Sequence, residues 1–186
     1  MKTYIETPRV RLRGWSDDDL EQWVEMNSDP RVMEFFPSVT PPERSREQAA
    51  LMRAEIETNG YGWFVMERKD TPGFAGVIAL AEVRWETPFQ PRREIGWRLP
   101  VHAWGQGFAT EGAAAAMNFA FTTLGWPEIV AFTSKLNLRS MRVMEKIGMT
   151  RDPREDFDHP RVPEGHPIRP HVLYRKKHRT ALEPPL

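Results

Sequence analysis

The stretch Trp104-Gly105-Gln106-Gly107-Phe108-Ala109-Thr110-Glu111-Gly112 marks a change from a strand-like to a helix-like pattern. Residues 93–99 before it form an apolar run typical of a strand, and residues 113–124 after it are alanine-rich with helical spacing. The glycines allow a tight turn and a close approach of the backbone to a ligand. Free N–H groups and the helix dipole favour negative charge where the helix begins. The stretch therefore predicts a turn that can bind a pyrophosphate.

Two common phosphate-binding loops do not match this stretch. The G-x-G-x-x-G loop of dinucleotide-binding domains requires a third glycine where Thr110 stands. The P-loop requires lysine and then serine or threonine after its last glycine, but Gly112 is followed by Ala113 and Ala114. The sequence therefore indicates a different kind of pyrophosphate loop.

The stretch resembles the pyrophosphate loop of the GNAT N-acetyltransferases, Q/R-x-x-G-x-G/A, at Gly107 and Ala109. Trp104 departs from the first position of that pattern. The longer string W-G-Q-G-F-A-T-E is similar to the branch that contains the ribosomal-protein N-acetyltransferases. On the loop alone, a strand-to-helix turn without a ligand is the alternative.

Composition indicates a single globular domain over residues 1–186, with 40% hydrophobic and 28% charged residues. The 26 basic and 26 acidic side chains balance, which argues against binding to nucleic acid or membrane mainly by charge. No cysteine is present, which excludes disulfides, thiolate metal sites and a cysteine nucleophile. The N-terminus has no apolar signal region and no run reaches membrane-spanning length, so we expect a cytoplasmic protein.

The pattern along the chain predicts an α/β protein, a mixed sheet with helices on both faces. Strands are expected at 8–13, 63–67, 74–83, 93–99, 128–133 and 171–176, with a further short strand at 149–151. Helices are expected at 16–29, capped by Ser16; at 40–58, capped by Thr40; at 113–124; and at 137–148, capped by Asn137. Residues 31–38 are interpreted as a loop that closes the core, with a pocket wall as the alternative. Gly96, inside an expected strand, is interpreted as a bulge or a close backbone approach. This order resembles the GNAT fold from about residue 9 to 176.

A second resemblance covers Asn137-Leu138-Arg139-Ser140 and Lys146-Ile147-Gly148-Met149, similar to the N-x-x-S…K-h-G-[FM] signature near the end of GNAT domains. It implies that Asn137 contacts the pantetheine arm or the substrate and that Ser140 donates a proton to the departing thiolate. Alternatively, Asn137 only caps a helix and Ser140 lies in its first turn. Both roles are compatible, since a cap uses one side-chain oxygen.

The resemblance implies acetyl transfer from acetyl-CoA to an amine, which requires a base. Glu94 is the candidate, since a glutamate on this strand serves as base in several GNAT groups; a structural carboxylate paired with Arg93 or Arg98 is the alternative. Backbone N–H groups of residues 96–99 would hold the thioester oxygen. The acetyl-CoA contacts implied are Trp97, Arg98, Leu99, Gln106, Gly107, Phe108, Ala109, Thr110, Asn137 and Ser140, and no metal is expected.

Residues 151–170 form an irregular segment with five prolines. We predict a flap near the acceptor site whose acidic residues attract a cationic amine, with a plain surface loop as the alternative. Its histidines match no standard metal site. The basic tail at 175–179 is predicted to be solvated.

The acceptor is expected to be a protein N-terminus or a small-molecule amine. A non-catalytic acyl-CoA-binding protein is the alternative from another functional class. Homodimers are common in the branch that the sequence resembles.

Overall fold

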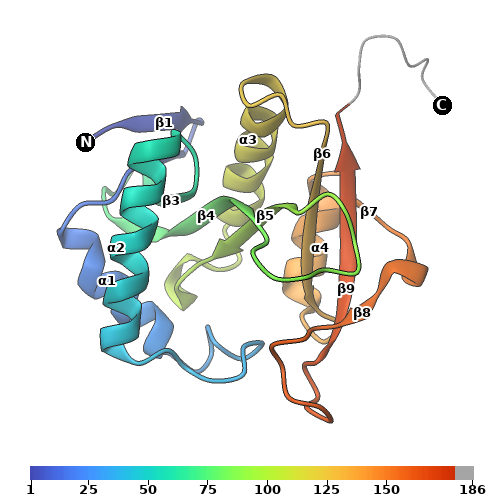
Figure 1. Ribbon diagram of the computed structural model, residues 1–186. Helices are drawn as coiled ribbons and strands as arrows, with labels where there is room; N and C mark the ends of the chain where they lie inside the picture. Colours follow the sequence, from blue (N-terminus) through green and yellow to red (C-terminus); the bar gives the residue numbers. More distant parts are fainter. Residues whose placement is uncertain (179–186) are drawn as a thin grey trace.

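The structure is a computed structural model that describes residues 1–178. Within these residues, one nine-stranded sheet runs in the order β1-β2-β3-β4-β5-β6-β9-β7, with β8 paired to β9 (Figure 1). The strands are β1 Thr3–Glu6, β2 Val10–Arg13, β3 Trp63–Arg68, β4 Phe74–Glu82, β5 Arg93–Arg98, β6 Glu128–Ser134, β7 Thr150–Arg151, β8 Phe157–Asp158 and β9 Pro170–Lys177. The helices are α1 Asp18–Ser28, α2 Pro42–Asn59, α3 Phe108–Thr122 and α4 Leu138–Lys146, with short 3-10 helices η1 Val101–Ala103 and η2 Pro153–Glu155. The predicted mixed sheet is confirmed, with β1 and β8 as additional strands.

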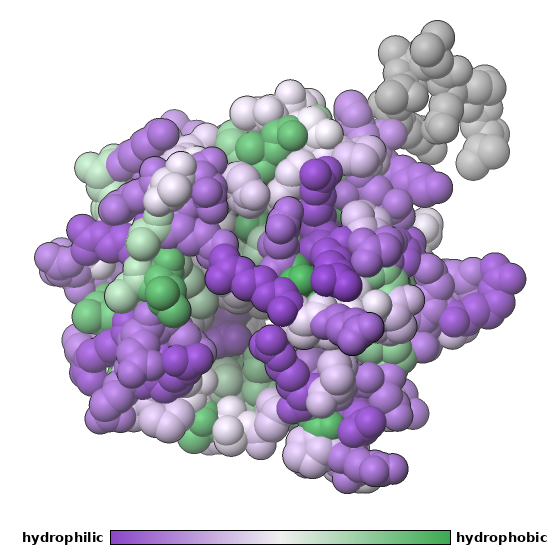
Figure 2. Space-filling model, viewed as in Figure 1, coloured by the Kyte–Doolittle hydropathy of each residue, from purple (hydrophilic) through white to green (hydrophobic). Residues whose placement is uncertain are grey.

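The sheet opens between β5 and β6. Strands β1 to β5 are antiparallel neighbours, whereas β5 and β6 are parallel and are joined by a single pair, Glu94 with Val130. Beyond this pair, the two halves of the sheet separate towards the carboxyl end of β5. The space-filling view is hollowed between the α1–α2 side and the C-terminal strands (Figure 2).

Helices cover both faces of the sheet. Arg98 contacts Asn27 of α1, while the next residue, Trp97, contacts Ser140 of α4. Because successive side chains of a strand point to opposite faces, α1 and α4 lie on opposite sides of β5. Helix α2 lies beside α1, and α3 lies beside α4 (Figure 1).

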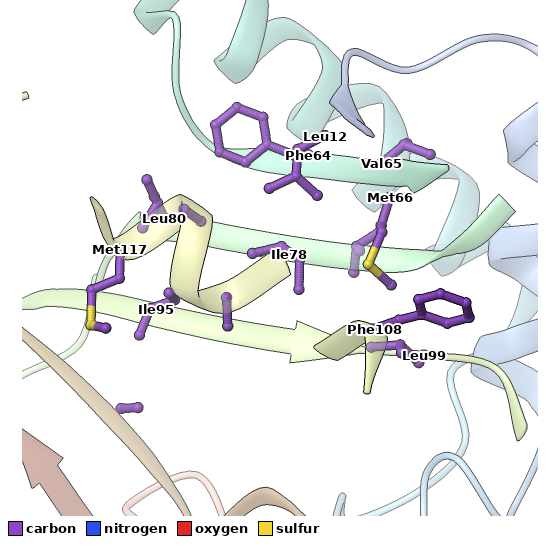
Figure 3. Close-up of a cluster of buried hydrophobic side chains, with 14 of the residues drawn as sticks. Leu12, Phe64, Val65, Met66, Ile78, Leu80, Ile95, Leu99, Phe108 and Met117 are labelled. Carbon is purple, nitrogen blue, oxygen red and sulfur yellow. The ribbon is translucent and has the colours of Figure 1, made fainter. Parts of the chain in front are cut away.

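The core lies between α3 and the antiparallel half of the sheet (Figure 3). In the middle of α3 the buried residues are mostly small, namely Gly112, Ala113, Ala116 and Ala120, so that the helix can approach Ile78 and Leu80 closely. A Cβ atom added at Gly112 would lie 3.1 Å from Cγ1 of Ile78 and 3.2 Å from the sulfur of Met66. This contact fixes the distance between α3 and the sheet, and with it the start of the helix at the central loop.

Two predicted helix caps are wrong by one residue. Asp17 rather than Ser16 is the N-cap of α1, and Pro41 rather than Thr40 precedes α2. In the first case Asp19, which is buried and pairs with Arg13 at 2.7 Å, still accepts hydrogen bonds from the backbone and hydroxyl of Ser16, as the residue three positions after a cap does.

The bulge expected at Gly96 is also wrong, because the register between β4 and β5 is unbroken. The irregularity lies instead between β3 and β4, next to Gly76. A Cβ atom at Gly76 would lie 2.5 Å from the carbonyl oxygen of Arg98, so the close backbone approach occurs there.

The basic tail is less solvated than predicted. Arg175 forms hydrogen bonds with Glu155 and Glu128, and Lys176 donates to the carbonyl of Ile147 at 2.6 Å. Arg179 lies outside the described residues. None of the helices in residues 1–178 is both long and apolar enough to cross a membrane.

Candidate active site

A cavity of about 660 Å³ lies where β5 and β6 separate. Residues 94–99 form one wall, and Phe132 and Thr133 of β6 form the opposite wall. The loop before α3, one side of α4 along its whole length and the segment before β9 also line it. The cavity thus brings together both sequence motifs and the candidate base.

The predicted pyrophosphate turn has the geometry of an anion site. Gly105 and Gly107 have φ angles of 73° and 83°, in the left-handed region that favours glycine. Gly107 is the N-cap of α3, and the first helical hydrogen bond runs from the Glu111 amide to the Gly107 carbonyl at 3.0 Å. The three preceding amides, of residues 108–110, therefore have no partner within the helix.

The residues of the turn before α3 contribute to the cavity in different ways. Gly107, Ala109 and Thr110 line the cavity. The side chain of Gln106 instead donates to the His102 carbonyl at 2.7 Å, and the Phe108 ring is buried in the core. These two predicted residues can therefore face a ligand only through their backbones.

An ion pair that the sequence did not indicate supports this turn. Glu111 accepts hydrogen bonds from the Thr7 hydroxyl at 2.6 Å and from Nε of Arg9 at 2.5 Å. Nη1 of Arg9 also donates to the Gln106 carbonyl at 2.9 Å. Glu111 thus ties the first turn of α3 to the β1–β2 turn. The two partners are about a hundred residues apart in the chain, so no local pattern could reveal the pair.

Glu94 lies in the cavity wall without a partner. Within residues 1–178 its carboxylate makes no hydrogen bond or ion pair, while Arg93 lies over the Trp126 ring and Arg98 contacts Asn27. The pairing with either arginine is therefore not found. Burial raises the pKa of Glu94 to about 7, so the carboxyl group titrates near neutral pH.

Asn137 and Ser140 are placed by the start of α4. Oδ1 of Asn137 accepts from the Ser140 amide at 3.1 Å, which confirms the predicted cap. Nδ2 of Asn137, expected to be free, donates to Oγ1 of Thr133 at 3.0 Å and keeps one hydrogen unused. Nε1 of Trp97 donates to Oγ of Ser140 at 3.2 Å. The hydroxyl hydrogen of Ser140 thus remains available to another acceptor in the cavity.

The end of β5 carries Arg98 and Leu99. Nη1 of Arg98 donates to Oδ1 of Asn27 at 2.5 Å, and the guanidinium lies over the Phe36 ring at 4.3 Å. The carbonyl of Leu99 accepts from Nε1 of Trp104 at 2.8 Å. The tryptophan that departs from the family pattern therefore fastens the pyrophosphate turn to the end of β5.

Two loops also line the cavity. The first loop, residues 31–38, contributes Val32, Phe35, Phe36 and Pro37. This stretch is therefore a pocket wall, which was the alternative interpretation of the sequence. From the proline-rich segment and the strand that follows it, His159, Arg161, Val162 and His171 contribute.

The placement of the acidic residues of the proline-rich segment does not support their predicted role of attracting a cationic amine into the cavity. None of them lines the cavity. Four are engaged by arginines, in the pairs Asp152–Arg154, Asp156–Arg151, Asp158–Arg169 and Glu155–Arg175. Among residues 1–178, no three His, Asp or Glu side chains are grouped so as to hold a metal ion.

The family described as "Acetyltransferase (GNAT) domain" matches residues 9–150, which include every strand and helix around the cavity up to α4. The chain belongs to the GNAT acetyltransferase family, and its enzyme class is N-acetyltransferase.

Individual relatives agree with this assignment. "Uncharacterized protein YkkB" of Bacillus subtilis is 30% identical over 149 residues, 80% of this chain and 86% of the relative. "FsC-acetyl coenzyme A-N(2)-transacetylase" of Aspergillus fumigatus is 31% identical over 153 residues, 78% of this chain but 64% of that longer protein. A GNAT-family acetyltransferase structure from Bacillus anthracis aligns with a TM-score of 0.77 and 26% identity, covering 93% of this chain and 97% of that one.

Proposed function

We propose that this protein transfers the acetyl group of acetyl-CoA to a primary amine, with Glu94 as the base and Ser140 as the acid. The observation that carries the proposal is the unpaired Glu94 carboxyl, with a pKa of about 7, in the same cavity as Ser140 and the turn before α3. A structural carboxylate would have a partner, whereas a general base works best with a pKa near the working pH.

The charges and hydrogen-bond donors of the cavity support acetyl-CoA as the cosubstrate. The unpartnered amides of residues 108–110 suit a pyrophosphate, and Arg142 and Lys146 add positive charge along α4. Asn137 retains one amide hydrogen for the pantetheine arm. The backbones of Trp97, Arg98 and Leu99 border the gap between β5 and β6.

Acetyl-CoA supplies the activated acyl carbon. Glu94 takes a proton from the acceptor amine as the N–C bond forms, and Ser140 gives its hydroxyl proton to the sulfur as the C–S bond breaks. Glu94 shares one face of β5 with Arg98, and Ser140 contacts Trp97 on the other face. Base and acid therefore approach the gap from opposite sides, and each recovers its starting state by proton exchange with water.

The acceptor is a protein N-terminus in this proposal, on the similarity of W-G-Q-G-F-A-T-E to the ribosomal-protein-acetylating branch. A small-molecule amine is the second candidate, favoured by the name of the Aspergillus fumigatus relative, an N(2)-transacetylase. A non-catalytic acyl-CoA-binding role is disfavoured, because it gives no reason for a partnerless carboxyl in the cavity.

The test measures thiol release with a panel of N-terminal peptides and small amines. Glu94→Gln and Ser140→Ala should each lower kcat by about 10²-fold. The affinity for CoA, measured by calorimetry, should change little.

Glu82→Gln and Ser28→Ala serve as controls, since both residues are exposed and lie outside the cavity. Full turnover in Glu94→Gln or Ser140→Ala would remove that residue from the mechanism. Absence of turnover with every amine, despite CoA binding, would contradict the proposed activity.

A further inference from the structure

Arg98 is a cation without a counterion. Within residues 1–178 it forms no ion pair, and its hydrogen bond is donated by Nη1 to the Asn27 amide oxygen. Nε is buried and has no hydrogen-bond partner. Nη2 also makes no hydrogen bond, but it is not buried, and Arg98 lines the cavity. A guanidinium held in this way is costly unless something else compensates its charge.

The position of Arg98 is built by α1 and α2. Asn27 is fully buried, and its Nδ2 lies 3.3 Å from Oγ of Ser45 on α2. Trp23, also fully buried, donates to the Ser45 carbonyl at 3.0 Å and lies 5.3 Å below the guanidinium. Phe36 covers the other side at 4.3 Å. Two helices therefore hold the cation in one place, which distinguishes it from a mobile surface arginine.

The surroundings of Arg98 contain little negative charge. Glu94 is the single carboxylate in the cavity lining formed by the described residues. The same lining carries four further cationic side chains, namely Arg139, Arg142, Lys146 and Arg161. Of these, Arg139 is paired with Glu34 outside the lining. An acceptor with several positive charges finds little compensation here.

Glu94 and Arg98 are joined by an open surface. They lie four residues apart on one face of β5, roughly 13 Å along the strand. Gly96 lies between them, and a Cβ atom at that position would meet nothing within 4 Å. A molecule lying over Gly96 can therefore place one end at Glu94 and the other at Arg98.

We propose that Arg98 binds a carboxylate of the acceptor, whose amine is placed at Glu94. This rests on the proposed function and narrows its substrate class to amines that carry a carboxylate several bonds away, as in a short peptide. A guanidinium matches a carboxylate in charge and planar shape. The ligand would supply the missing counterion of Arg98, while polyamines would be poor acceptors.

The test compares acceptors that differ only in this charge. Short peptides are each offered with a free C-terminal carboxylate and as the C-terminal amide, together with spermidine. The wild-type protein should prefer the carboxylate forms by at least tenfold in kcat/KM. In Arg98→Gln this preference should fall to about one, because glutamine can replace the hydrogen bond to Asn27 but not the charge.

Arg98→Lys, which keeps the charge, should retain a part of the preference. Arg92→Gln is the matched control, since Arg92 is exposed and lies outside the cavity, and it should leave the preference unchanged. Circular dichroism and CoA calorimetry show which variants are folded. If Arg98→Gln does not fold, the wild-type ratio and Arg98→Lys still decide the question.

Equal use of carboxylate and amide forms by the wild type, or efficient acetylation of spermidine, would overturn the role of Arg98 and leave the proposed acetyl transfer intact. Failure to acetylate any amine while CoA binds would instead count against the proposed function itself.

Discussion

At the scale of single residues, the site depends on charges that lack partners. Many arginines and carboxylates on the surface form ion pairs, but within residues 1–178 Glu94 and Arg98 do not, although both line the cavity. Burial moves both pKa values towards the neutral form, that of Glu94 up to about 7 and that of Arg98 down to about 10. Arg98 retains a hydrogen bond to Asn27 and two ring contacts, but neither side chain has an opposite charge beside it among residues 1–178, which is consistent with a role in binding a ligand.

Measurements of unfolding can detect how much the ionised Glu94 carboxylate destabilises the fold. Its folded pKa is raised, so its contribution to stability is present below about pH 4.5 and is lost as the pH rises through about 7. Glu94→Gln removes this loss. The free energy of unfolding of the variant should therefore gain about 1–3 kcal/mol relative to wild type between pH 5 and pH 8. Urea unfolding at both pH values measures it, and a difference independent of pH would mean that Glu94 has an ordinary pKa.

At the scale of elements, the start of α3 is the part that function most constrains. The positive φ of Gly107 and the open turn leave three amides free at the N-cap. Gly107→Glu should lower the affinity for CoA by at least tenfold, because it adds a side chain and a negative charge beside these amides. Gly60→Glu is the matched control: its φ of 75° is similar and its surroundings are open, but it caps α2 outside the cavity. Equal CoA affinity in the two variants, by calorimetry, would contradict the pyrophosphate site.

Every long strand and helix was predicted from the sequence, most of them from apolar runs or apolar periodicity, and α2 from its start and stop signals, since it buries only Ser45, Ala49 and Ile56. The sequence pattern missed β1, whose four residues are half-exposed and lack alternation. It placed the cap of α1 at Ser16, one residue before the observed cap at Asp17, although Asp19 does accept a hydrogen bond from the Ser16 amide. The bulge expected at Gly96 is not found, because Gly76 on the neighbouring strand makes the close contact instead.

At the scale of the whole molecule, the cavity joins segments from across the chain. The motif residues Gly107, Asn137 and Ser140 were predictable, since short patterns contain them. Three other features could not be predicted, because each depends on which distant segments the fold brings together. They are the unpaired state of Glu94, the support of Arg98 by α1 and the cavity wall at residues 31–38.

The proline-rich segment gives a prediction at this scale. His159, Arg161 and Val162 of this segment line the cavity, whereas the turn before α3 contributes Gly105 and Gly107. Shortening residues 156–167 to a tight turn, which also removes β8 and the buried Val162, should abolish or redirect acceptor use and leave the affinity for CoA within about twofold. Arg154→Gln is a control in the same segment, because its side chain is 89% exposed and pairs with Asp152 away from the cavity. Weaker CoA binding with unchanged acceptor use would show that the segment serves the cofactor side.

The opening of the sheet after the pair of Glu94 with Val130 has a further consequence. An unpaired strand edge on the outside of a protein invites other chains to add to it and to aggregate. Here the edges of β5 and β6 face each other inside the molecule, bordered by α4 and the proline-rich segment. We expect a slender molecule with its own amide groups to enter this gap and pair with the backbone, as a peptide pairs with a sheet edge. The unpaired backbone groups of β5 and β6 are thus available for hydrogen bonds to a ligand in the cavity, while they are not exposed as an outer sheet edge to other protein chains.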